Sequence, residues 1–221
     1  MKIMIATPAY DGKVHAQYAN ALAETCSMLC SQGISIDLFI CPSGSLLCAE
    51  RNRIMKRFME SDCTHILCID SDLGWPALAV DAMIKHNVDF VAGVYPARKA
   101  KMFLYRACFN ADGSLQTNGV NLVKMEAVPA GFMLIKKEVI QKVIELNPDL
   151  YFRPKDPNAP DGYALFNTML IDKEFWGEDF VFCRLVLAAG FDIWADPAIQ
   201  FDHDGNIGMF AEILTNREKQ Q

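Results

Sequence analysis

The strongest constraint on the fold of this chain is a regular alternation, in its first half, of short apolar runs with longer amphipathic runs. Short apolar runs between turn residues are typical of buried strands, and apolar side chains at helical spacing are typical of amphipathic helices. The predicted strands are residues 2–7, 34–41, 64–69 and 88–94, and the predicted helices are 15–31, 47–60 and 75–86. Repeated strand–helix–strand units form a parallel sheet with right-handed crossovers. We therefore expect an α/β fold with a mostly parallel central sheet flanked by helices.

The second half of the chain has a different character. Asp112-Gly113-Ser114 is a turn signal between two apolar segments, which predicts a smaller antiparallel part. The further expected elements are strands within 102–110, 121–125, 128–135 and 191–195 and helices over 136–146 and 178–189. The Pro/Asp/Gly-rich segment 153–167 is long enough for a functional loop that closes over a ligand. We expect one domain over residues 1–205 and a polar, fraying tail over 206–221.

Composition excludes several classes of protein. The 221 residues are 52% apolar and 22% charged, an ordinary globular balance, and the net charge of −6 argues against binding to polymeric nucleic acid. The sequence shows neither a signal peptide nor an apolar run long enough for an integral membrane segment. The eight cysteines include no CxxC pair and predict free thiols in a reducing, cytoplasmic environment.

Two carboxylates, Asp70 and Asp72, directly follow the predicted strand 64–69. Ligands of open α/β sheets bind at the carboxyl ends of the strands. Two neighbouring carboxylates suit a hard divalent cation such as Mn²⁺ or Mg²⁺, which would also neutralise phosphate oxygens. The alternative interpretation is that these residues only cap the following helix.

Two other groups of polar residues are candidates for chemistry. Glu178 and Asp179 open a predicted helix, where acids either complement the helix dipole or provide a general base. His203 lies between two acids and is either a metal ligand or a surface histidine. The sequence contains no GxSxG, GxGxxG or P-loop motif.

The order of these features resembles the GT-A glycosyltransferases, in particular family-2-like enzymes. The matching residues extend over about residues 1–205. They are Thr7-Pro8-Ala9-Tyr10, Arg51-Asn52, Asp70-Ser71-Asp72, Ala130-Gly131-Phe132, Glu178-Asp179, Arg184, Gly190 and His203.

The resemblance implies a single-domain, Rossmann-like GT-A fold and transfer of a sugar from a nucleotide-sugar, with UDP favoured, to an acceptor hydroxyl. By position it implies that Thr7, Pro8 and Tyr10 form the wall of the nucleoside pocket and that Arg51 contacts the nucleotide. Asp70, Ser71 and Gly131 would lie in the donor site, with Asp70 also near the metal, and Asp72 and His203 would be ligands of Mn²⁺ or Mg²⁺. Asp179, or Glu178, would be the catalytic base of an inverting reaction.

Two segments leave the substrates open. Residues 41–45 carry no acid where family members contact the nucleobase, and the basic residues of 98–101 either meet phosphates or are solvated. The acceptor, whether saccharide, lipid-linked or protein, is not indicated. Two other functions stay possible on the sequence: a sugar-phosphate nucleotidyltransferase, although residues 7–13 lack its Gly-rich basic loop, and a non-catalytic nucleotide-sugar or carbohydrate-binding module.

Overall fold

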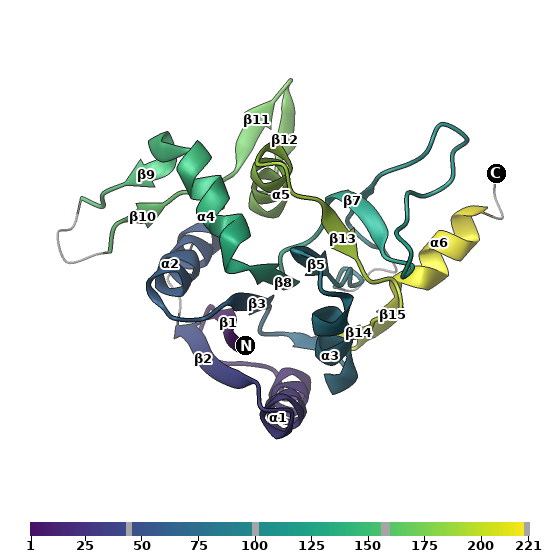
Figure 1. Ribbon diagram of the computed structural model, residues 1–221, viewed down its shortest axis with the longest axis horizontal. Coiled ribbons are helices and arrows are strands. Elements are labelled where there is room, and N and C mark those ends of the chain that lie inside the picture. Colours follow the sequence, from purple (N-terminus) through teal and green to yellow (C-terminus); the bar gives the residue numbers. More distant parts are fainter. Residues whose placement is uncertain (43–45, 99–101, 156–159, 219–221) are drawn as a thin grey trace.

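The computed structural model describes residues 1–42, 46–98, 102–155 and 160–218 and contains a central eight-stranded sheet (Figure 1). The strands across this sheet are, in order, β2 (Ser35–Pro42), β1 (Lys2–Ala9), β3 (His65–Ile69), β8 (Phe132–Lys136), β5 (Phe90–Ala92), β13 (Ile193–Ala195), β7 (Val123–Ala127) and β6 (Arg106–Ala107). Parallel pairing joins β2 to β1, β1 to β3 and β5 to β13, whereas β8 and β7 run in the opposite direction. The expected mostly parallel sheet is confirmed.

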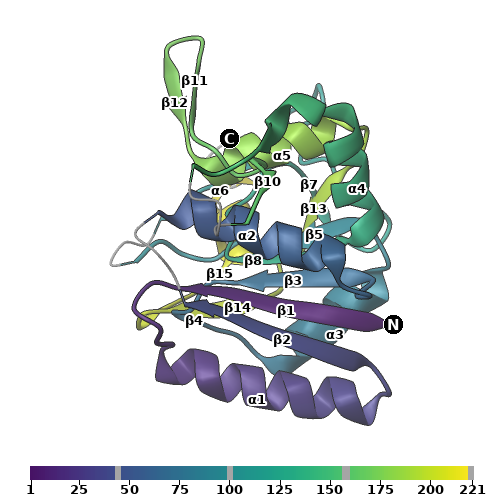
Figure 2. The same ribbon diagram turned by 90° about the vertical axis from the view of Figure 1, so that its left-hand side faces the viewer.

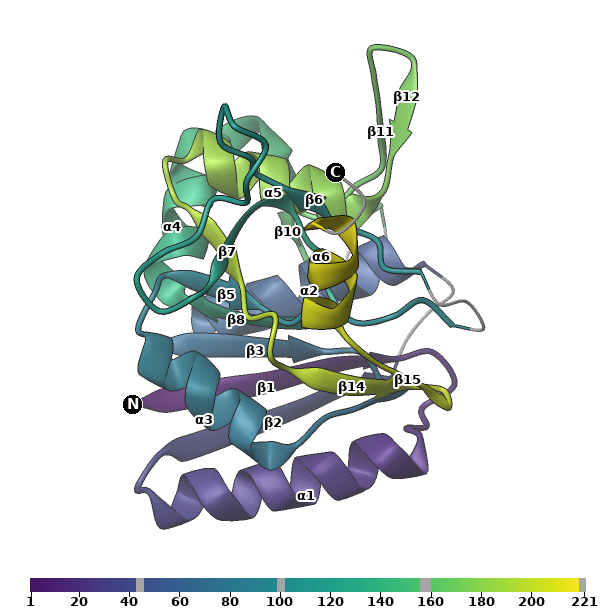
Figure 3. The same cartoon turned by 90° about the vertical axis from the view of Figure 1, so that its right-hand side faces the viewer.

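Helices cover both faces of the sheet (Figures 2 and 3). One face carries α1 (Ala16–Ser31) and α3 (Ala77–His86), and the other carries α2 (Leu47–Glu60), α4 (Lys137–Leu146) and α5 (Glu178–Ala188). The side chains of β1 alternate between the two cores: Ile3 and Ile5 pack toward α1, and Met4 and Ala6 pack toward α2. Every residue of β1 after Lys2 is buried, and all of these except Thr7 are apolar, as is typical of a strand covered on both faces.

Smaller antiparallel elements occupy the second half of the chain. The short strand β4 (Leu73–Gly74) pairs with β14 (Gln200–His203), which pairs with β15 (Asn206–Met209). A second pair joins β9 (Tyr151–Phe152), which follows the 3₁₀ turn Pro148–Leu150, to β10 (Gly162–Tyr163). A hairpin of β11 (Met169–Ile171) and β12 (Glu174–Trp176) projects from the body directly before α5 (Figure 1).

The first strand continues past the point where the sequence predicts its end. The expected strand ends at residue 7, before Pro8, but β1 runs to Ala9 and pairs with β2 over its whole length. Pairing of β1 with β3 ends at Ala6, so Pro8 has a neighbouring strand on one side only. A proline, which lacks an N–H donor, is compatible with such an edge position.

The C-terminal segment also differs from the expected polar tail. Residues 206–209 form β15, and α6 (Phe210–Glu218) follows it. Phe210 is fully buried against Phe103 and Tyr105, and Leu214 is also buried. These two apolar residues, four apart on a helix, dock the segment on the same core as α2 and α5. Residues 219–221 of the expected tail lie outside the described residues.

Two further sequence expectations concern cysteines and membranes. All eight cysteines are free thiols in the structure. Within the described residues, no helix combines the length and the apolar character that crossing a bilayer requires.

Replacing Phe210 with alanine tests the docking of α6. Removal of a fully buried phenylalanine costs about 3–5 kcal/mol of unfolding free energy, measurable by urea denaturation. The matched control is Glu212→Ala on the exposed face of the same helix, expected to stay within about 0.5 kcal/mol of wild type. If Phe210→Ala were as stable as the control, the segment would be the tail expected from the sequence.

Candidate active site

Strand register brings the two halves of the chain together at the carboxyl end of β3. Ile69, the last residue of β3, pairs with Phe132, the first residue of β8. The residues just beyond this pair, Asp70 and Gly131, therefore face each other, and the Asp70 N–H donates to the Gly131 carbonyl at 2.9 Å. The Asp-x-Asp segment and the Gly131 segment thus meet at the edge where open α/β sheets bind ligands.

The guanidinium of Arg51 is buried at this edge, where only 5% of the residue is exposed. One terminal nitrogen donates to the Ala130 carbonyl at 3.1 Å and the other to Asp70 Oδ1 at 2.9 Å. Its Nε lies 3.6 Å from Glu178 Oε1 at the start of α5. Arg51 therefore connects α2 to β3, β8 and α5 and has its charge neutralised by carboxylates from two of them.

Asn52, the next residue of α2, fastens the loop that leads to the β11–β12 hairpin. Its side-chain amide donates to the Phe166 carbonyl at 2.9 Å and accepts from the Phe166 N–H at 2.8 Å. The Phe166 ring stacks on Phe182 of α5 at a centroid distance of 4.3 Å. The Arg51-Asn52 pair thus positions α5 in two ways: Arg51 faces Glu178 directly, and Asn52 holds Phe166 against the helix.

Tyr95, which follows β5, lies at the centre of the site. Its hydroxyl donates to Asp70 Oδ2 at 3.1 Å and accepts from the Gly131 N–H at 3.1 Å, and its ring meets the His203 ring edge-on at 5.2 Å. Burial and the nearby Asp70 carboxylate raise the pKa of Tyr95, with a smaller contribution from Asp179, so the phenol stays protonated. A Cβ at Gly131 would lie 2.2 Å from the Tyr95 hydroxyl, so the close approach requires glycine.

Asp72 and His203 form the second polar group of the site. Antiparallel pairing of Leu73 with His203 places the imidazole beside Asp72, with Nε2 3.1 Å from Asp72 Oδ2. His203 Nδ1 lies 2.6 Å from the carbonyl of Pro96, which can only accept, so Nδ1 carries a hydrogen. Nε2 and the carboxylate oxygen are then two acceptors facing each other, unless a proton or a cation lies between them.

Arg98 supplies a positive charge at this pair. Its Nε donates to Asp72 Oδ2 at 2.5 Å, a terminal nitrogen contacts the same oxygen, and Nε lies 3.3 Å from His203 Nε2. Burial opposes ionisation of Asp72, but His203 and Arg98 outweigh it and lower the pKa of the carboxyl. Burial likewise opposes protonation of His203, but its bonds to Asp72 and Pro96 raise the pKa of the imidazole.

The Asp72–His203 pair fits a divalent cation with two protein ligands. A histidine that ligates a metal usually donates its other ring N–H to a carbonyl or carboxylate, as His203 does to Pro96. Two protein ligands would leave coordination positions for phosphate oxygens and water. Asp70, expected near the metal, is instead turned to Arg51 and Tyr95. Among the described residues no three His, Cys, Asp or Glu side chains converge as a metal-binding group.

Glu178 and Asp179 open α5, as expected, and differ in environment. Asp179 Oδ1 accepts from the Phe180 N–H at 2.8 Å. Burial, and then repulsion by Glu178, raise the pKa of Asp179 to about 6, despite the Phe180 N–H and Arg51, which favour the ionised form. The position at a helix N-terminus favours the ionised form, but burial outweighs it. Asp179 is still mostly ionised at neutral pH.

The residues expected around the nucleoside occupy different depths. Thr7 is fully buried, with its hydroxyl 2.5 Å from that of Tyr18, and Pro8 is also buried. Tyr10, by contrast, is 74% exposed at the end of β1. Ser71 is half-buried, and its carbonyl accepts from the His15 N–H at 2.9 Å. Of this set, Tyr10 has the most side-chain surface available to a ligand.

Two residues of the site did not emerge from the sequence in their observed roles. Tyr95 received no role, although it follows a predicted strand at its carboxyl end, which is a usable signal. For Arg98 the sequence indicates only a place in a basic segment that is either solvated or near phosphates. Residues 43–45 and 99–101, which complete the two segments left open above, lie outside the described residues.

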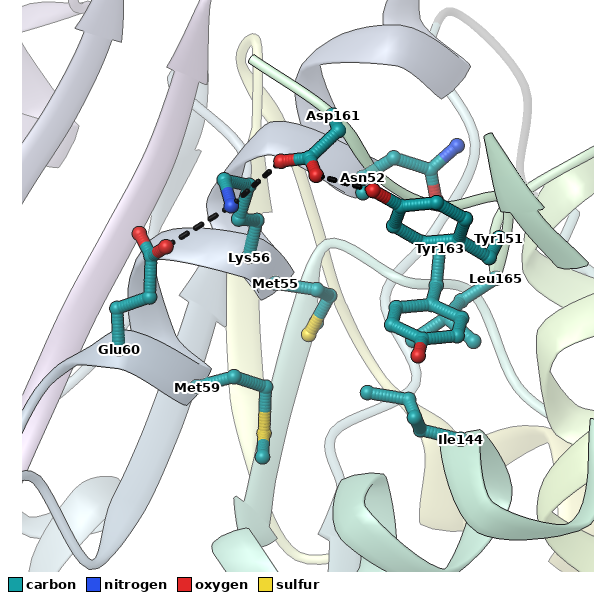
Figure 4. Close-up of a pocket in the computed structure, with 11 residues that line it drawn as sticks. Asn52, Met55, Lys56, Met59, Glu60, Ile144, Tyr151, Asp161, Tyr163 and Leu165 are labelled. Atoms are coloured by element: carbon teal, nitrogen blue, oxygen red, sulfur yellow. Dashed lines mark hydrogen bonds and ion pairs between the residues drawn. The ribbon is translucent and has the colours of Figure 1, made fainter. Parts of the chain in front are cut away.

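A cavity of about 190 Å³ lies beside α2, and its lining includes none of Asp70, Asp72 and Asp179 (Figure 4). Its wall includes Met55, Met59 and Tyr163, and its polar rim is paired internally: Lys56 contacts Glu60 at 2.8 Å and Asp161 at 2.9 Å. The expected closing loop, described at residues 153–155 and 160–167, contributes Asp161, Gly162, Tyr163 and Leu165 to this wall. Closure of that loop over a donor stays a prediction.

The raised pKa of Asp179 makes a prediction about stability. A carboxyl whose pKa rises from 3.8 to about 6 on folding favours the folded state below pH 4 and loses that contribution as the pH rises through 6. At neutral pH the buried, ionised carboxylate therefore destabilises the folded state, and Asp179→Asn removes this destabilisation. We expect it to be more stable than wild type at pH 7, by up to about 3 kcal/mol in urea unfolding, and similar to wild type at pH 4.

Asp161→Asn is the matched control of opposite sign. A hydrogen bond from Tyr151 and then one from Lys56 lower the pKa of Asp161, so its contribution is present at neutral pH and is lost as the pH falls. Asp161→Asn should therefore be less stable than wild type at pH 7. A loss of stability in Asp179→Asn at pH 7 would contradict the assigned environment of Asp179.

Comparison with known proteins locates the fold. No family model matches the sequence, and no curated protein matches it. The structure is similar to that of A197 from STIV, with a TM-score of 0.54 and 14% identity over 95% of this chain and 94% of that one.

Solved glycosyltransferases are similar at lower scores. The catalytic domain of Drosophila beta1,4galactosyltransferase 7, in complex with xylobiose, has a TM-score of 0.49 and 15% identity over 93% of this chain and 71% of that one. S. aureus TarS 1–349 in complex with UDP has a TM-score of 0.46 and 13% identity over 89% of this chain and 58% of that one. At these identities the similarity concerns fold alone: the expected α/β fold with a mostly parallel sheet is confirmed, and the GT-A resemblance stays a prediction.

Proposed function

We propose that this protein transfers a sugar from a nucleotide-sugar, with UDP as the favoured nucleotide, to an acceptor hydroxyl. The observation that carries the proposal is the Asp72–His203 pair, with its atoms 3.1 Å apart and its imidazole fixed by Pro96. Tyr95 connects this pair to Asp70 and lies within electrostatic range of Asp179. A cation-binding pair and a separate basic carboxylate are what displacement of a diphosphate by a hydroxyl requires.

Asp72 and His203 are the proposed ligands of Mn²⁺ or Mg²⁺. The cation would act as a Lewis acid that stabilises the negative charge developing on the departing diphosphate. Asp72 is 2% exposed and His203 is 8% exposed, so both are held in place before any ligand binds. One oxygen of Asp70 is bonded to Arg51 and the other to Tyr95, so the carboxylate is held rigidly. In the proposed site it accepts a hydrogen bond from a hydroxyl of the nucleotide-sugar.

Asp179 is the proposed catalytic base. A pKa of about 6 leaves it ionised at neutral pH and yet close to the pH at which proton transfer is most efficient. As the acceptor oxygen attacks the anomeric carbon, its proton moves to Asp179 and the bond to the diphosphate breaks. A single base and a direct displacement give inversion. Glu178 faces Arg51 in this arrangement and tunes Asp179 by repulsion.

The remaining parts of the proposal concern substrates and location. Tyr10 is the proposed contact to the nucleoside, since it is largely exposed at the carboxyl end of β1. Arg51, expected on the nucleotide, is proposed to act indirectly, because its guanidinium is buried against protein groups. The free thiols support a reducing cytoplasm.

Metal dependence is tested by binding rather than by turnover. Asp72→Asn and His203→Ala should each weaken Mn²⁺ binding in the presence of UDP by at least about tenfold. This is the lower end of the affinity loss caused by mutating even the residues that support metal ligands. Titration followed by electron paramagnetic resonance (EPR) of free Mn²⁺ measures this directly. Asp37→Asn, on the remote strand β2, is the control. Unchanged Mn²⁺ affinity in both site variants would exclude the pair as ligands.

The role of Asp179 is tested by turnover. Asp179→Asn keeps the size of the side chain and the bond to Phe180 but removes basicity, so kcat should fall about 10²- to 10⁴-fold while donor affinity stays near wild type. Glu178→Gln should be milder. In wild type, kcat should rise with pH through about 6. NMR of the product should show inversion at the anomeric carbon; retention, or near-normal turnover of Asp179→Asn, would refute the assignment.

Two other measurements separate the alternative functions. Release of a nucleotide-sugar from a sugar phosphate and a nucleoside triphosphate would identify a nucleotidyltransferase. Donor binding by calorimetry without product from a broad acceptor panel would identify a non-catalytic binding module.

A further inference from the structure

Arg98 contacts both residues that we assign to the cation. Its Nε is 2.5 Å from Asp72 Oδ2 and 3.3 Å from His203 Nε2. In the ligand-free protein the guanidinium therefore occupies the place, and supplies the charge, that a divalent cation bound to the pair would have. Two positive groups that share one carboxylate oxygen repel each other, so the guanidinium and the cation exclude each other there.

The two sides of this contact differ in their freedom to move. Asp72 and His203 are almost completely buried, whereas 62% of the Arg98 side chain is exposed. The backbone just before Arg98 is fixed: the Ala97 N–H donates to the Met102 carbonyl at 2.7 Å, and the Ala97 carbonyl accepts from Asn206 Nδ2 at 2.8 Å. Arg98 can leave by side-chain rotation while the cation pair and the backbone at Ala97 stay in place.

We propose that Arg98 is an exchangeable counter-ion: it holds the cation position in the free protein and transfers to the donor diphosphate when metal and donor bind. This inference rests on the proposed function. Phosphate oxygens that ligate the cation necessarily come next to Asp72, within reach of the displaced guanidinium. A guanidinium binds phosphate through two parallel N–H···O bonds, so it exchanges one anionic partner for another.

The exchange links the two ligands thermodynamically. Metal alone has to break the Arg98–Asp72 ion pair without replacing it, so it binds weakly. Metal together with a nucleoside diphosphate gives Arg98 a new partner, so each ligand strengthens the binding of the other. Arg98 is therefore a positioning residue that makes the site take up metal and donor together.

The test measures Mn²⁺ binding by EPR of the free ion, with and without UDP, in wild type, Arg98→Ala and Arg98→Lys. For Arg98→Ala we expect Mn²⁺ alone to bind about 5- to 150-fold more tightly than in wild type, and the enhancement of Mn²⁺ binding by UDP to fall by a similar factor, the usual range of coupling between sites. Arg98→Lys keeps the charge but not the planar guanidinium. Its Mn²⁺ affinity, and the enhancement of that affinity by UDP, should lie between those of wild type and Arg98→Ala. Circular dichroism checks that each variant is folded.

Arg57→Ala removes an exposed arginine that pairs with Asp37 on β2, at 3.6 Å, and is the matched control. It should leave both Mn²⁺ affinities unchanged. If wild type binds Mn²⁺ and UDP but Arg98→Ala binds Mn²⁺ alone no more tightly, the exchange is refuted and the metal assignment stands. If wild type takes up no Mn²⁺ even with UDP, the metal assignment itself is refuted, and the exchange with it.

Discussion

The buried guanidinium of Arg51 is the interaction on which the rest of the site depends. It lies between the end of β3, the start of β8 and the first turn of α5, and donates to Ala130 and Asp70 while facing Glu178. Removing one partner of a buried ion pair costs about 3–5 kcal/mol, because the other charge is left uncompensated. Arg51 thereby holds in one geometry carboxylates that are more than a hundred residues apart in the sequence.

The consequence is a site with one buried and one largely exposed positive charge. Arg51 is buried and fixes Asp70 beside Gly131, whereas the Arg98 side chain is largely exposed and balances the charge of Asp72. Asp179 lies in an environment set by burial and by Glu178, which together raise its pKa to about 6. Each carboxylate therefore lies in a different electrostatic environment, and this difference is consistent with the separate roles proposed for them: structural anchor, cation ligand and base.

The sequence allowed prediction of those features that depend on local pattern. Apolar periodicity located the first three parallel strands and α2, and chain order located Asp70, Asp72 and Asp179 at strand and helix ends. Features that depend on tertiary contact were not accessible. Three such features are the burial of Arg51, the bond from His203 to Pro96 and the docking of Phe210. Each depends on contacts between residues that are distant in the sequence. The last residues are mostly polar, so the sequence did not indicate that Phe210 and Leu214 anchor α6.

The central claim, that this edge of the sheet binds a nucleotide-sugar with a divalent cation, is tested most directly by thermal unfolding with a panel of nucleotide-sugars, with and without Mn²⁺. A donor at one hundred times its Kd stabilises the folded state by about 2.7 kcal/mol. For a chain of this length we expect a rise in Tm of about 5–11 °C, from about 2–4 °C per kcal/mol, with the cognate UDP-sugar and Mn²⁺ together. A Tm unchanged by every nucleotide-sugar in the presence of Mn²⁺ would contradict the account.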